Sequence, residues 1–424
     1  MLDYDDKIIN NQGMYKSRLL TDRLKKLAGA FPAVVVSGAR QVGKSTLIRH
    51  VFGRTADIVV FDPVQDIENA RQDPELFLSN HKTPLVLDEI QYAPEVISAV
   101  KRRIDRDRTP GQYIITGSQQ WGVLKSMAES LAGRAMFIDL EGFCLAEIAE
   151  QIEADHWLAQ WLEDPQKFSE RQHPRLPLDS SLYELLWRGW LPQACFLETD
   201  LIGEFYQAYL RTYIERDVRL LADVADWQLF GRFVQLTAAL TAQEINYSQF
   251  GRELGITPQT SRRWLAMLRA TYQWFEVPAY SGNTVKRISG KPKGYFADTG
   301  LACSLQAISS ARAIAGHPLL GTLFETAVAG EIRKLSAAMS PKPNMYHWRT
   351  QDGAEVDLLL ELNGFFFPIE IKVKSQPSKN DTRGISAFRK IYPRLKIAPG
   401  LVIAPTDGFR PISEKDYALP WDSR

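Results

Sequence analysis

The sequence lacks the features of secreted, membrane-spanning or strongly charged proteins. Its 424 residues contain only three cysteines, Cys144, Cys195 and Cys303. Their odd number and scattered positions exclude a disulfide framework and a cysteine metal site, and they fit core thiols in a reducing compartment. The chain begins Met-Leu-Asp-Tyr-Asp-Asp, which is not a signal peptide, and no run approaches the roughly twenty apolar residues that span a membrane. We expect a cytoplasmic protein with no membrane partner.

An excess of either charge is also missing. The 51 Lys and Arg balance the 50 Asp and Glu, so the formal net charge is +1. Any attraction to nucleic acid must therefore come from local patches. Residues 141–164 contain seven acidic residues and no Lys or Arg, whereas residues 246–293 contain eight Lys and Arg and two acidic residues. The hydrophobic content of 45% fits a globular protein, and the length indicates two or three domains.

A complete phosphate-binding motif is present near the N-terminus. The apolar run Phe31–Ser37 predicts a strand, residues 38–46 predict a loop, and Leu47–Val51 predicts a helix. In the spacing GxxxxGK[ST], backbone N–H groups curl around phosphate, the lysine reaches the outer phosphates and the serine ligates magnesium. The alternative is a glycine-rich turn that matches by chance, but the flanking strand and helix favour the motif. The predicted nucleotide-binding residues are Gly38, Ala39, Arg40, Gln41, Val42, Gly43, Lys44, Ser45 and Thr46.

Two carboxylates follow a second apolar run about forty residues after this loop. The run Leu85–Leu87 is followed by Asp88 and Glu89. A buried parallel strand delivers such residues to the carboxyl edge of a sheet. We expect Asp88 to hold Mg²⁺ through water and Glu89 to orient the attacking water. A solvated acidic turn is the alternative. Further strands are predicted at 58–61, 113–116 and 136–140, separated by helical stretches, which indicates a parallel sheet flanked by helices.

Two further residues are candidates for the same site. Ser118, in Thr116-Gly-Ser-Gln, is placed as a polar sensor between the loop and the magnesium carboxylates. Arg134, in Ser130-Leu-Ala-Gly-Arg, is a candidate arginine finger that reaches the γ-phosphate of a neighbouring subunit. That role predicts a homo-oligomer, such as a hexameric ring. Equally open is a helix C-cap role, in which Gly133 turns and Arg134 is solvated.

These motifs resemble the prokaryotic AAA-family ATPases that carry a characteristic C-terminal domain of unknown function. The resemblance covers nearly the whole chain and implies that the AAA+ module binds ATP with Mg²⁺ and hydrolyses it. One departure is Trp190, which stands where the usual family pattern has a second glycine. The residues that carry the likeness are the runs 38–45, 87–91, 116–118, 130–134, 187–192, 205–218 and 293–302.

The middle of the chain predicts a connector and then a DNA-binding module. Residues 157–175 are rich in Trp, Pro and charge without a clear period, which favours a linker, and residues 204–218 have the helical spacing of a core helix. Residues 247–268 then read as a helix, a turn at Gly255 and a second helix capped by Thr257. On this second helix the predicted polar face is Gln259, Ser261, Arg262 and Arg263, and the predicted inward face is Trp264, Leu265 and Leu268.

A basic, glycine-rich segment follows this helix pair. Lys286, Arg287, Lys291 and Lys293 would form the wing of a winged helix and neutralise DNA phosphates. The alternative is a winged helix that serves as a protein-interaction or packing module. The predicted DNA-binding residues are Arg262, Arg263, Lys286 and Arg287.

The last third has the pattern of a nuclease-like site. A helix over 323–332 precedes strands at 346–349, 353–361 and 365–374, and Asn-Gly at 363–364 is a strong hairpin signal. Glu370 and Lys372 share one strand face, which Asp357 can reach from the partner strand. This set resembles the PD-(D/E)xK nuclease core, with Glu325 on the preceding helix as its fourth acidic position. The alternative is a salt-bridged solvent face of a hairpin.

The nuclease reading assigns a role to each residue. Carboxylates hold magnesium at the scissile phosphate, and the lysine positions or activates the attacking water. The metal ligands would be Glu325, Asp357 and Glu370, and the catalytic residues Asp357, Glu370 and Lys372.

The sequence therefore predicts an α/β chain in four parts. These are an AAA+ P-loop module with a parallel sheet (1–145), an acidic and Trp/Pro-rich connector (146–200), a helical and winged-helix region (201–300) and a restriction-endonuclease-like α/β domain (301–424). Three functions stay open. One is an oligomeric ATPase that remodels or moves along DNA and carries a metal-dependent nuclease. The others are an ATP-dependent switch that binds DNA or protein without cleaving it, and a protein-interaction platform.

Overall fold

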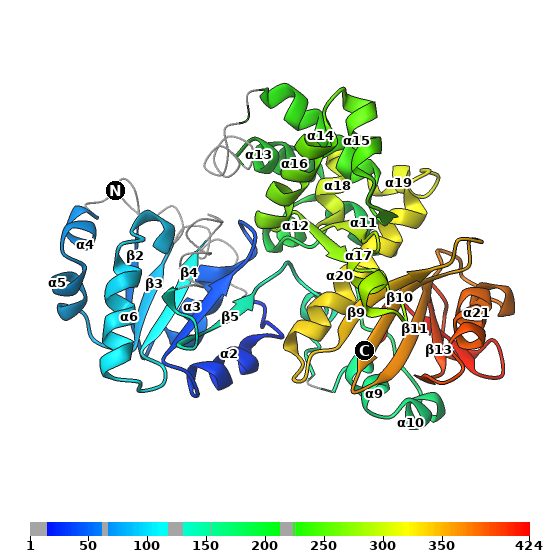
Figure 1. Cartoon of the computed structure of the whole chain (residues 1–424), viewed down its shortest axis with the longest axis horizontal. Coiled ribbons are helices and arrows are strands. Elements are labelled where there is room, and N and C mark those ends of the chain that lie inside the picture. The colour runs from blue at the N-terminus through cyan, green and yellow to red at the C-terminus, as the bar shows by residue number, and fades with distance from the viewer. Residues whose placement is uncertain (1–14, 62–66, 118–129, 154, 213–223, 225) are drawn as a thin grey trace.

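Three regions make up the structure, a computed structural model that describes residues 15–61, 67–117, 130–153, 155–212, 224 and 226–424. The N-terminal lobe comprises residues 15–139, the helical region residues 182–314 and the C-terminal region residues 320–424. Figure 1 shows the N-terminal lobe at one end and the other two regions packed together at the other end.

The N-terminal lobe is a five-stranded parallel sheet in the order β2-β3-β4-β1-β5. Val34 and Val36 of β1 pack in one core cluster, whereas Ala33 and Val35 pack in another. Because both faces of β1 are covered, its sequence is continuously apolar and does not alternate. The predicted strands and parallel sheet are confirmed. The strands are β1 (Ala33–Ser37), β2 (Asp57–Val60), β3 (Leu85–Asp88), β4 (Tyr113–Gly117) and β5 (Ala135–Asp139), and the helices are α2 (Thr21–Ala28), α3 (Lys44–Phe52), α4 (Glu68–Gln72), α5 (Pro74–Ser79) and α6 (Val96–Arg106).

The helical region surrounds a small antiparallel sheet in the order β6-β8-β7. The core helix expected over 204–218 is present as α13, and residues 213–218 lie outside the described part of the chain. The helices are α11 (Leu182–Arg188), α12 (Pro192–Phe196), α13 (Ile202–Thr212), α14 (Trp227–Ala239), α15 (Tyr247–Leu254), α16 (Pro258–Ala270), α17 (Thr284–Ser289), α18 (Thr299–Leu305) and α19 (Ala311–Ile314), and the strands are β6 (Gln243–Glu244), β7 (Trp274–Val277) and β8 (Lys293–Phe296).

The C-terminal region is a mixed sheet in the order β14-β15-β13-β11-β10-β9, with β12 beside β11. β10 and β11 form the predicted hairpin, and Asn363 and Gly364 at its turn both have positive φ, at 53° and 78°. A type I′ turn requires this. The elements are α20 (Leu320–Ala338), β9 (Asn344–Arg349), β10 (Glu355–Leu362), β11 (Phe365–Ile371), α21 (Arg383–Ile391), β12 (Lys396–Ile397), β13 (Gly400–Ala404), β14 (Arg410–Pro411) and β15 (Asp416–Pro420).

The stretch expected to be a linker is folded against this sheet. It forms α9 (Trp157–Glu163) and α10 (Pro165–Glu170), and the short helix α8 (Leu145–Ile148) precedes it. The Trp161 ring meets Phe367 of β11 edge-on at 5.3 Å, and Arg175 pairs with Asp422 at 2.8 Å. The apolar residues of the stretch supply core, and its helices are too short to give a readable period. Figure 1 shows α9 and α10 below the C-terminal sheet.

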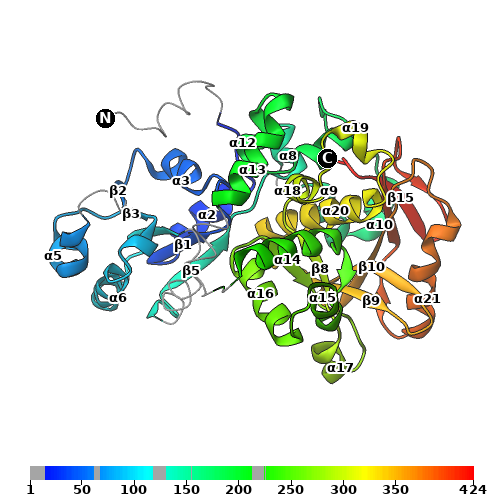
Figure 2. The same ribbon diagram turned by 90° about the horizontal axis from the view of Figure 1, so that it is seen from above.

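The segment that follows β5 joins the N-terminal lobe to the other regions. Arg333 of α20 pairs with Glu141 at 2.5 Å. Arg18, which is 5% exposed, donates to the carbonyls of Val42 at 2.7 Å and Glu141 at 2.6 Å. It also pairs with Glu147 at 3.1 Å. Figure 2 shows β5 on the side of the lobe that faces the rest of the molecule.

Two expectations from composition concern the whole chain. Cys144 and Cys303 are buried, as core thiols should be, and Cys195 is partly buried. Within the described residues, no helix combines the length and the apolarity needed to cross a membrane.

Candidate functional site

The predicted phosphate loop lies between β1 and α3, and its glycines are required by geometry. Gly38 has φ 147°, and a Cβ there would lie 2.0 Å from the carbonyl oxygen of Leu140. Gly43, at the N-cap of α3, has φ 90°, which is costly for any residue with a Cβ. The Lys44 side chain is folded into this loop, where its ammonium donates to the carbonyls of Gly38 at 3.0 Å and Ala39 at 2.8 Å. The loop therefore holds one buried positive charge, as phosphate binding requires.

The magnesium carboxylate predicted from the sequence lies beside this loop. Asp88 ends β3 and is 3% exposed. Burial raises its pKa, while hydrogen bonds from Thr116 and Ser45 act in the opposite direction. A carboxylate next to a serine hydroxyl is the oxygen donor set that Mg²⁺ prefers. Ser45, Asp88 and Lys44 thus fit a magnesium nucleotide. Bound Mg²⁺ would neutralise phosphate charge there.

Glu89 is held in an unusual backbone conformation. Its φ is 58°, in the left-handed region that only a few per cent of non-glycine residues adopt. Its backbone N–H donates to the Thr116 hydroxyl at 3.1 Å, and Gln91 donates from its side-chain amide to the Glu89 carboxylate. The carboxylate is therefore positioned by its neighbours, as the base or water-orienting group of a hydrolase should be.

Thr116 is a site residue that the sequence reasoning did not select. It donates a hydrogen bond to Asp88 while it accepts one from the Glu89 backbone. β4 lies between β1 and β3, so its last residues reach the space between the loop and the carboxylates. That position is the one predicted for a polar sensor. Ser118, the residue chosen for this role, lies outside the described residues.

Arg134 lies at the opposite edge of the sheet from the phosphate loop. It directly precedes β5, whose first residue pairs with the first residue of β1. Its guanidinium binds Asp105 of α6 at 2.6 and 3.0 Å and the carbonyl of Ala132 at 3.0 Å. Gly133 has φ 71°, as the C-cap alternative expects. Arg134 cannot act on the phosphate loop of its own chain, and a role in a neighbouring chain stays a prediction.

The helix-turn-helix expected at 247–268 is formed by α15 and α16. Gly255 has φ 70°, and the Thr257 side chain caps α16 by accepting from the N–H of Thr260 at 3.1 Å. Arg262 and Arg263 are exposed as predicted, as is Gln259, while Trp264, Leu265 and Leu268 are buried. The prediction that Ser261 belongs to the exposed polar face is wrong. Its side chain is fully buried, and its hydroxyl donates to the Thr257 carbonyl at 3.2 Å. It lies on the same helix stripe as Trp264 and Leu265.

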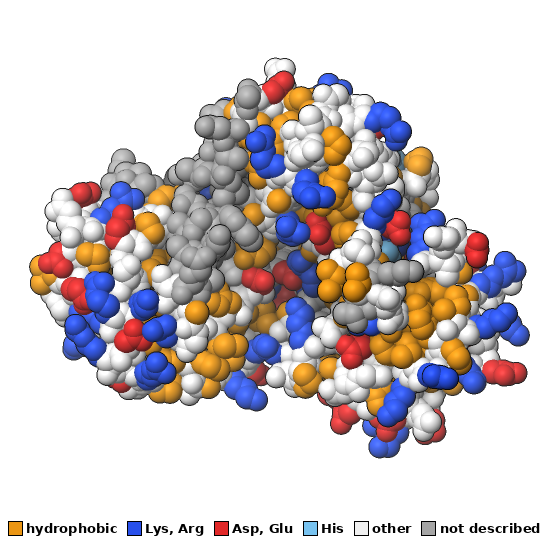
Figure 3. Space-filling view, in the orientation of Figure 1, with side chains coloured by type: hydrophobic (Ala, Val, Ile, Leu, Met, Phe, Trp, Pro, Cys, Tyr) orange, Lys and Arg blue, Asp and Glu red, His pale blue; other side chains and the backbone are white. Residues whose placement is uncertain are grey.

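The basic segment after α16 faces the protein more than expected. Arg287 packs over the Tyr280 ring at 4.6 Å and donates to the Ser281 carbonyl at 3.0 Å. Lys293 is only 8% exposed. Both side chains are engaged within the chain, Arg287 by Tyr280 and Ser281 and Lys293 by Glu325, so neither is directed toward DNA. The Lys286 side chain is outside the described part, and Lys291 is exposed. On the face in Figure 3, Lys and Arg side chains are scattered over the helical region without forming one continuous stripe.

The predicted nuclease-like residues come together. Lys372 donates to Glu370 at 2.8 Å and to Asp357 at 3.1 Å, and Asp357 also accepts from the Ile371 backbone at 2.9 Å. Asp357 and Glu370 are each 3% exposed, so the alternative of a solvent-facing hairpin surface is wrong. Glu325 joins the group through Lys293, which lies 2.5 Å from Glu325 and 3.6 Å from Asp357.

The sequence reasoning missed Lys293 and Tyr295 as members of this cluster. Both come from β8 of the helical region, and the Tyr295 hydroxyl donates to Glu325 at 2.9 Å. No local pattern could reveal them, because they meet the carboxylates only through packing between regions. One oxygen of Glu370, Oε1, is buried without a hydrogen-bond partner.

The charges in this cluster are strongly perturbed. Burial, with the nearby charge of Asp357, raises the pKa of Glu370 to about 9, and burial raises that of Glu325 to about 7. Burial opposes ionisation of Asp357 too, but Lys293 and Lys372 outweigh it and hold its pKa below the usual value. No three Asp, Glu, His or Cys residues of the described ranges are arranged to hold a metal. The predicted ligands Glu325, Asp357 and Glu370 are bound to lysines instead.

Comparisons with known proteins divide the chain in a similar way. Residues 30–149 match the AAA domain family. Residues 179–312 match a domain of unknown function (DUF8612), and residues 320–423 match another (DUF4143). The first part of the chain is thus similar to the AAA-type P-loop domains, as the motifs predicted. The other two matches assign no activity.

Whole-chain relatives and solved structures give no further activity. The uncharacterized protein Rv2008c of Mycobacterium tuberculosis and Mb2031c of Mycobacterium bovis are each 29% identical over 401 residues, covering 94% of this chain and 82% of theirs. The Walker-type ATPase PABY2304 of Pyrococcus abyssi is 14% identical with a TM-score of 0.43, covering 70% of this chain and 99% of its own. A signal transduction ATPase with numerous domains, PH0952 of Pyrococcus horikoshii, is 13% identical with a TM-score of 0.29, covering 78% of this chain and 50% of its own.

Proposed function

We propose that this chain is an ATP-hydrolysing switch whose nucleotide state controls how its helical region contacts DNA. The AAA module supplies the nucleotide site: Lys44 binds phosphate, Asp88 and Ser45 hold Mg²⁺, and Glu89 orients water. The helical region supplies the partner surface. Working as a homo-oligomer, such an ATPase would remodel DNA or move along it.

A hydrogen-bonded link between the two regions carries the proposal. Ser37, the residue before Gly38 of the phosphate loop, donates to the Asp139 carboxylate at 2.7 Å. The Tyr272 hydroxyl donates to the same oxygen at 3.1 Å. Burial and the charge of Asp139 raise the pKa of Tyr272, so the hydroxyl keeps its proton. Tyr272 follows α16 by two residues, so a shift of the loop strand is transmitted to that helix.

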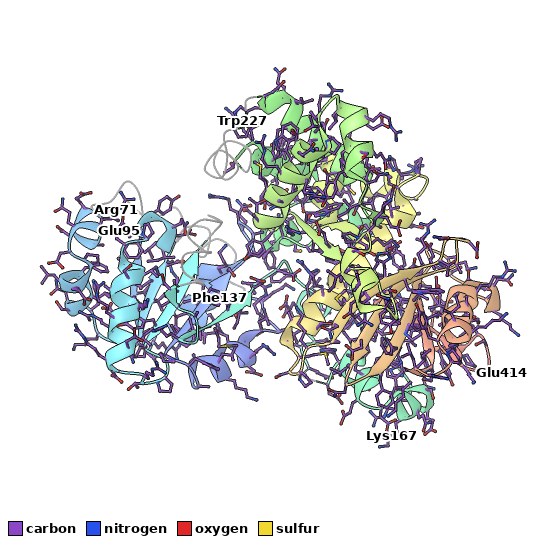
Figure 4. All side chains as sticks on the ribbon, viewed as in Figure 1. Arg71, Glu95, Phe137, Lys167, Trp227 and Glu414 are labelled. Atoms are coloured by element: carbon purple, nitrogen blue, oxygen red, sulfur yellow. The ribbon has the colours of Figure 1, made fainter. Side chains whose placement is uncertain are left out.

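The surroundings of this link leave room for movement. A cleft of about 510 Å³ separates the N-terminal lobe from the helical region beside Tyr272, and Glu141 and Arg333 also line it. Phe137 of β5 is 40% exposed on the same side of the lobe (Figure 4). The polar contacts across this cleft are the proposed two-state element, because an interface with two stable arrangements amplifies a small shift at an effector site.

DNA is the proposed partner because of α16. Gln259, Arg262 and Arg263 are exposed on the second helix of a helix-turn-helix, the helix that enters the major groove in winged-helix proteins. Since Arg287 and Lys293 are engaged elsewhere, the wing contributes less charge than the sequence suggested.

The experiment measures DNA affinity in fixed nucleotide states. Glu89→Gln is expected to bind ATP without hydrolysing it and so to hold the ATP state. We expect its DNA dissociation constant with ATP to differ from that with ADP by roughly five-fold or more, a range typical of allosteric coupling. Adding Tyr272→Phe should bring the two values together. Tyr183→Phe, at an exposed tyrosine, is the control. A nucleotide dependence that survives Tyr272→Phe would refute the link.

A second candidate function is a metal-dependent nuclease in the C-terminal region. The buried, unpartnered Oε1 of Glu370, next to Asp357, favours it, since a cation is a partner that such an oxygen can take. Asp357 and Glu370 would hold the ion, with Lys372 beside the attacking water. Lys293 and Lys372 oppose the nuclease candidate, because in this structure they bind the carboxylates that would hold the ion.

A further inference from the structure

Lys293 connects the helical region to the carboxylate cluster of the C-terminal region. Its backbone belongs to β8, where it pairs with Val277 of β7 and Glu244 of β6. Its side chain leaves that sheet and reaches α20 and β10. Lys293 and Tyr295 are two residues apart, so both point to the same side of β8. Both contact Glu325.

The Lys293 ammonium lies where two carboxylates converge. It is 2.5 Å from Glu325 Oε1 and 3.6 Å from Asp357 Oδ1, whereas the other oxygen of Asp357 is bound by Lys372. A divalent ion in this cluster would need the same carboxylate oxygens at about 2.0–2.6 Å. An ammonium already there both occupies the position and repels the incoming ion. Glu370 Oε1, in the same cluster, is buried without a hydrogen-bond partner.

We propose that Lys293 acts as an internal cation that keeps divalent metal out of the Glu325, Asp357 and Glu370 cluster. The position of β8 then decides whether the cluster can bind an ion. β8 pairs with β7, which begins at Trp274, two residues after Tyr272 and its contact with the N-terminal lobe. A movement that draws β8 away from α20 would withdraw the lysine and open the cluster. The inference depends on the second candidate function only for treating these carboxylates as ion ligands.

A purely structural ion pair makes a different prediction. Breaking a buried ion pair by removing one partner destabilises the fold, because the other charge is left uncompensated. In that case loss of the Lys293 charge lowers stability and creates no affinity for metal. If Lys293 stands in for an ion, the same loss creates a site in which added metal restores the stability.

The test uses the full chain with Asp88→Asn, which removes the magnesium carboxylate of the AAA module. Lys293→Met is compared with Lys291→Met, at an exposed lysine two residues earlier. Mn²⁺ binding is followed by electron paramagnetic resonance, and thermal unfolding is followed with and without Mn²⁺. We expect at least ten-fold tighter Mn²⁺ binding in Lys293→Met than in Lys291→Met or the parent chain. A further Glu370→Gln should abolish the gain, and Mn²⁺ should raise the melting temperature of Lys293→Met alone.

Two outcomes overturn the proposal. One is equal Mn²⁺ affinity in folded Lys293→Met and Lys291→Met. The other is tight Mn²⁺ binding by the parent chain. This measurement needs no substitution at Lys293, so it tests the proposal even if Lys293→Met does not fold. Lys293→Gln, which keeps a donor for Glu325 without the charge, replaces it in that case. Mn²⁺ binding without DNA cleavage would support the role of Lys293 and remove the nuclease candidate.

Discussion

Buried lysines illustrate how neighbours decide the chemistry of a residue in this protein. Lys44 and Lys293 are 6% and 8% exposed, so each must be paired. The Lys44 ammonium donates hydrogen bonds to main-chain carbonyls of its loop. These oxygens carry only partial charges, so little electrostatic energy is lost when the ammonium moves to a phosphate. Lys293 is held by the side chains of Glu325 and Asp357, which attract its charge more strongly than main-chain carbonyls do. We therefore expect the first lysine to move to a bound phosphate, whereas the second excludes a metal ion.

At the same scale, the acidic residues of the C-terminal cluster give the sharpest test of nuclease chemistry. With ATP and Mn²⁺ supplied, we expect Asp357→Asn and Glu370→Gln to abolish DNA cleavage, because each removes a ligand charge. Lys372→Ala should slow cleavage by about 10²-fold without abolishing it, since a group that only positions water contributes on that order. Gel assays on duplexes and junctions measure this.

The matched control for these substitutions is Glu361→Gln. Glu361 lies on the same strand as Asp357 but is partly exposed and bonded to Asn344 at 2.7 Å. It should cut like the wild type. Failure of the wild type to cut any substrate, with metal present and ATP both supplied and withheld, would leave the cluster as an ion-paired core.

At the scale of elements, local signals sufficed wherever one segment determines its own conformation. Gly255 and Thr257 fix the turn and cap of α16, and Asn363 with Gly364 fixes the β10–β11 hairpin, so both could be predicted. Ser261 could not be placed correctly from polarity, because its hydroxyl satisfies itself on the helix backbone and can then be buried. Polarity alone is a weak guide to exposure for such a residue.

The DNA role of α16 is testable through its two exposed arginines. We expect Arg262→Ala with Arg263→Ala to weaken DNA binding and to reduce the slope of log affinity against log salt by about 2, since each lost phosphate contact releases about one counterion fewer. The measurement is fluorescence anisotropy of a labelled duplex over a salt series. Arg312→Ala with Lys390→Ala removes the same charge from exposed positions on α19 and α21 and should leave the slope unchanged. A slope untouched by the arginine changes would return α16 to a packing role.

At the scale of the whole molecule, the contacts between regions were beyond the reach of sequence patterns. Arg18 contacts both the phosphate loop, at the Val42 carbonyl, and the segment after β5, at Glu141 and Glu147. Lys293 contacts Glu325 and Asp357, which lie more than thirty residues further along the chain. Neither Arg18 nor Lys293 belongs to a motif. The stretch containing Trp161 looked like a linker because its burial partner, Phe367, is two hundred residues away. Motifs that contact phosphate or metal are constrained locally, whereas partners across regions are fixed only by the completed fold.

The assembly of the molecule is the last prediction, and it follows from the position of Arg134. That residue lies at the amino edge of the sheet, paired with Asp105, so any phosphate it reaches must belong to another chain. Arg134→Ala alone should slow ATP hydrolysis by about 10³-fold, as loss of an arginine finger does. Lys44→Ala should be inactive by itself. An equal mixture should recover roughly a quarter of wild-type activity, because one in four sites then joins an intact loop to an intact finger.

The control for rescue is a mixture of Arg134→Ala with the double variant Lys44→Ala/Arg134→Ala, which contains no finger and should stay inactive. Native mass spectrometry establishes that mixed oligomers form. Inactive mixed oligomers, or an Arg134→Ala protein that hydrolyses ATP at the wild-type rate, would assign Arg134 to the turn between Gly133 and β5. Arg134 would then have a structural role only, in which its ion pair with Asp105 connects the start of β5 to α6.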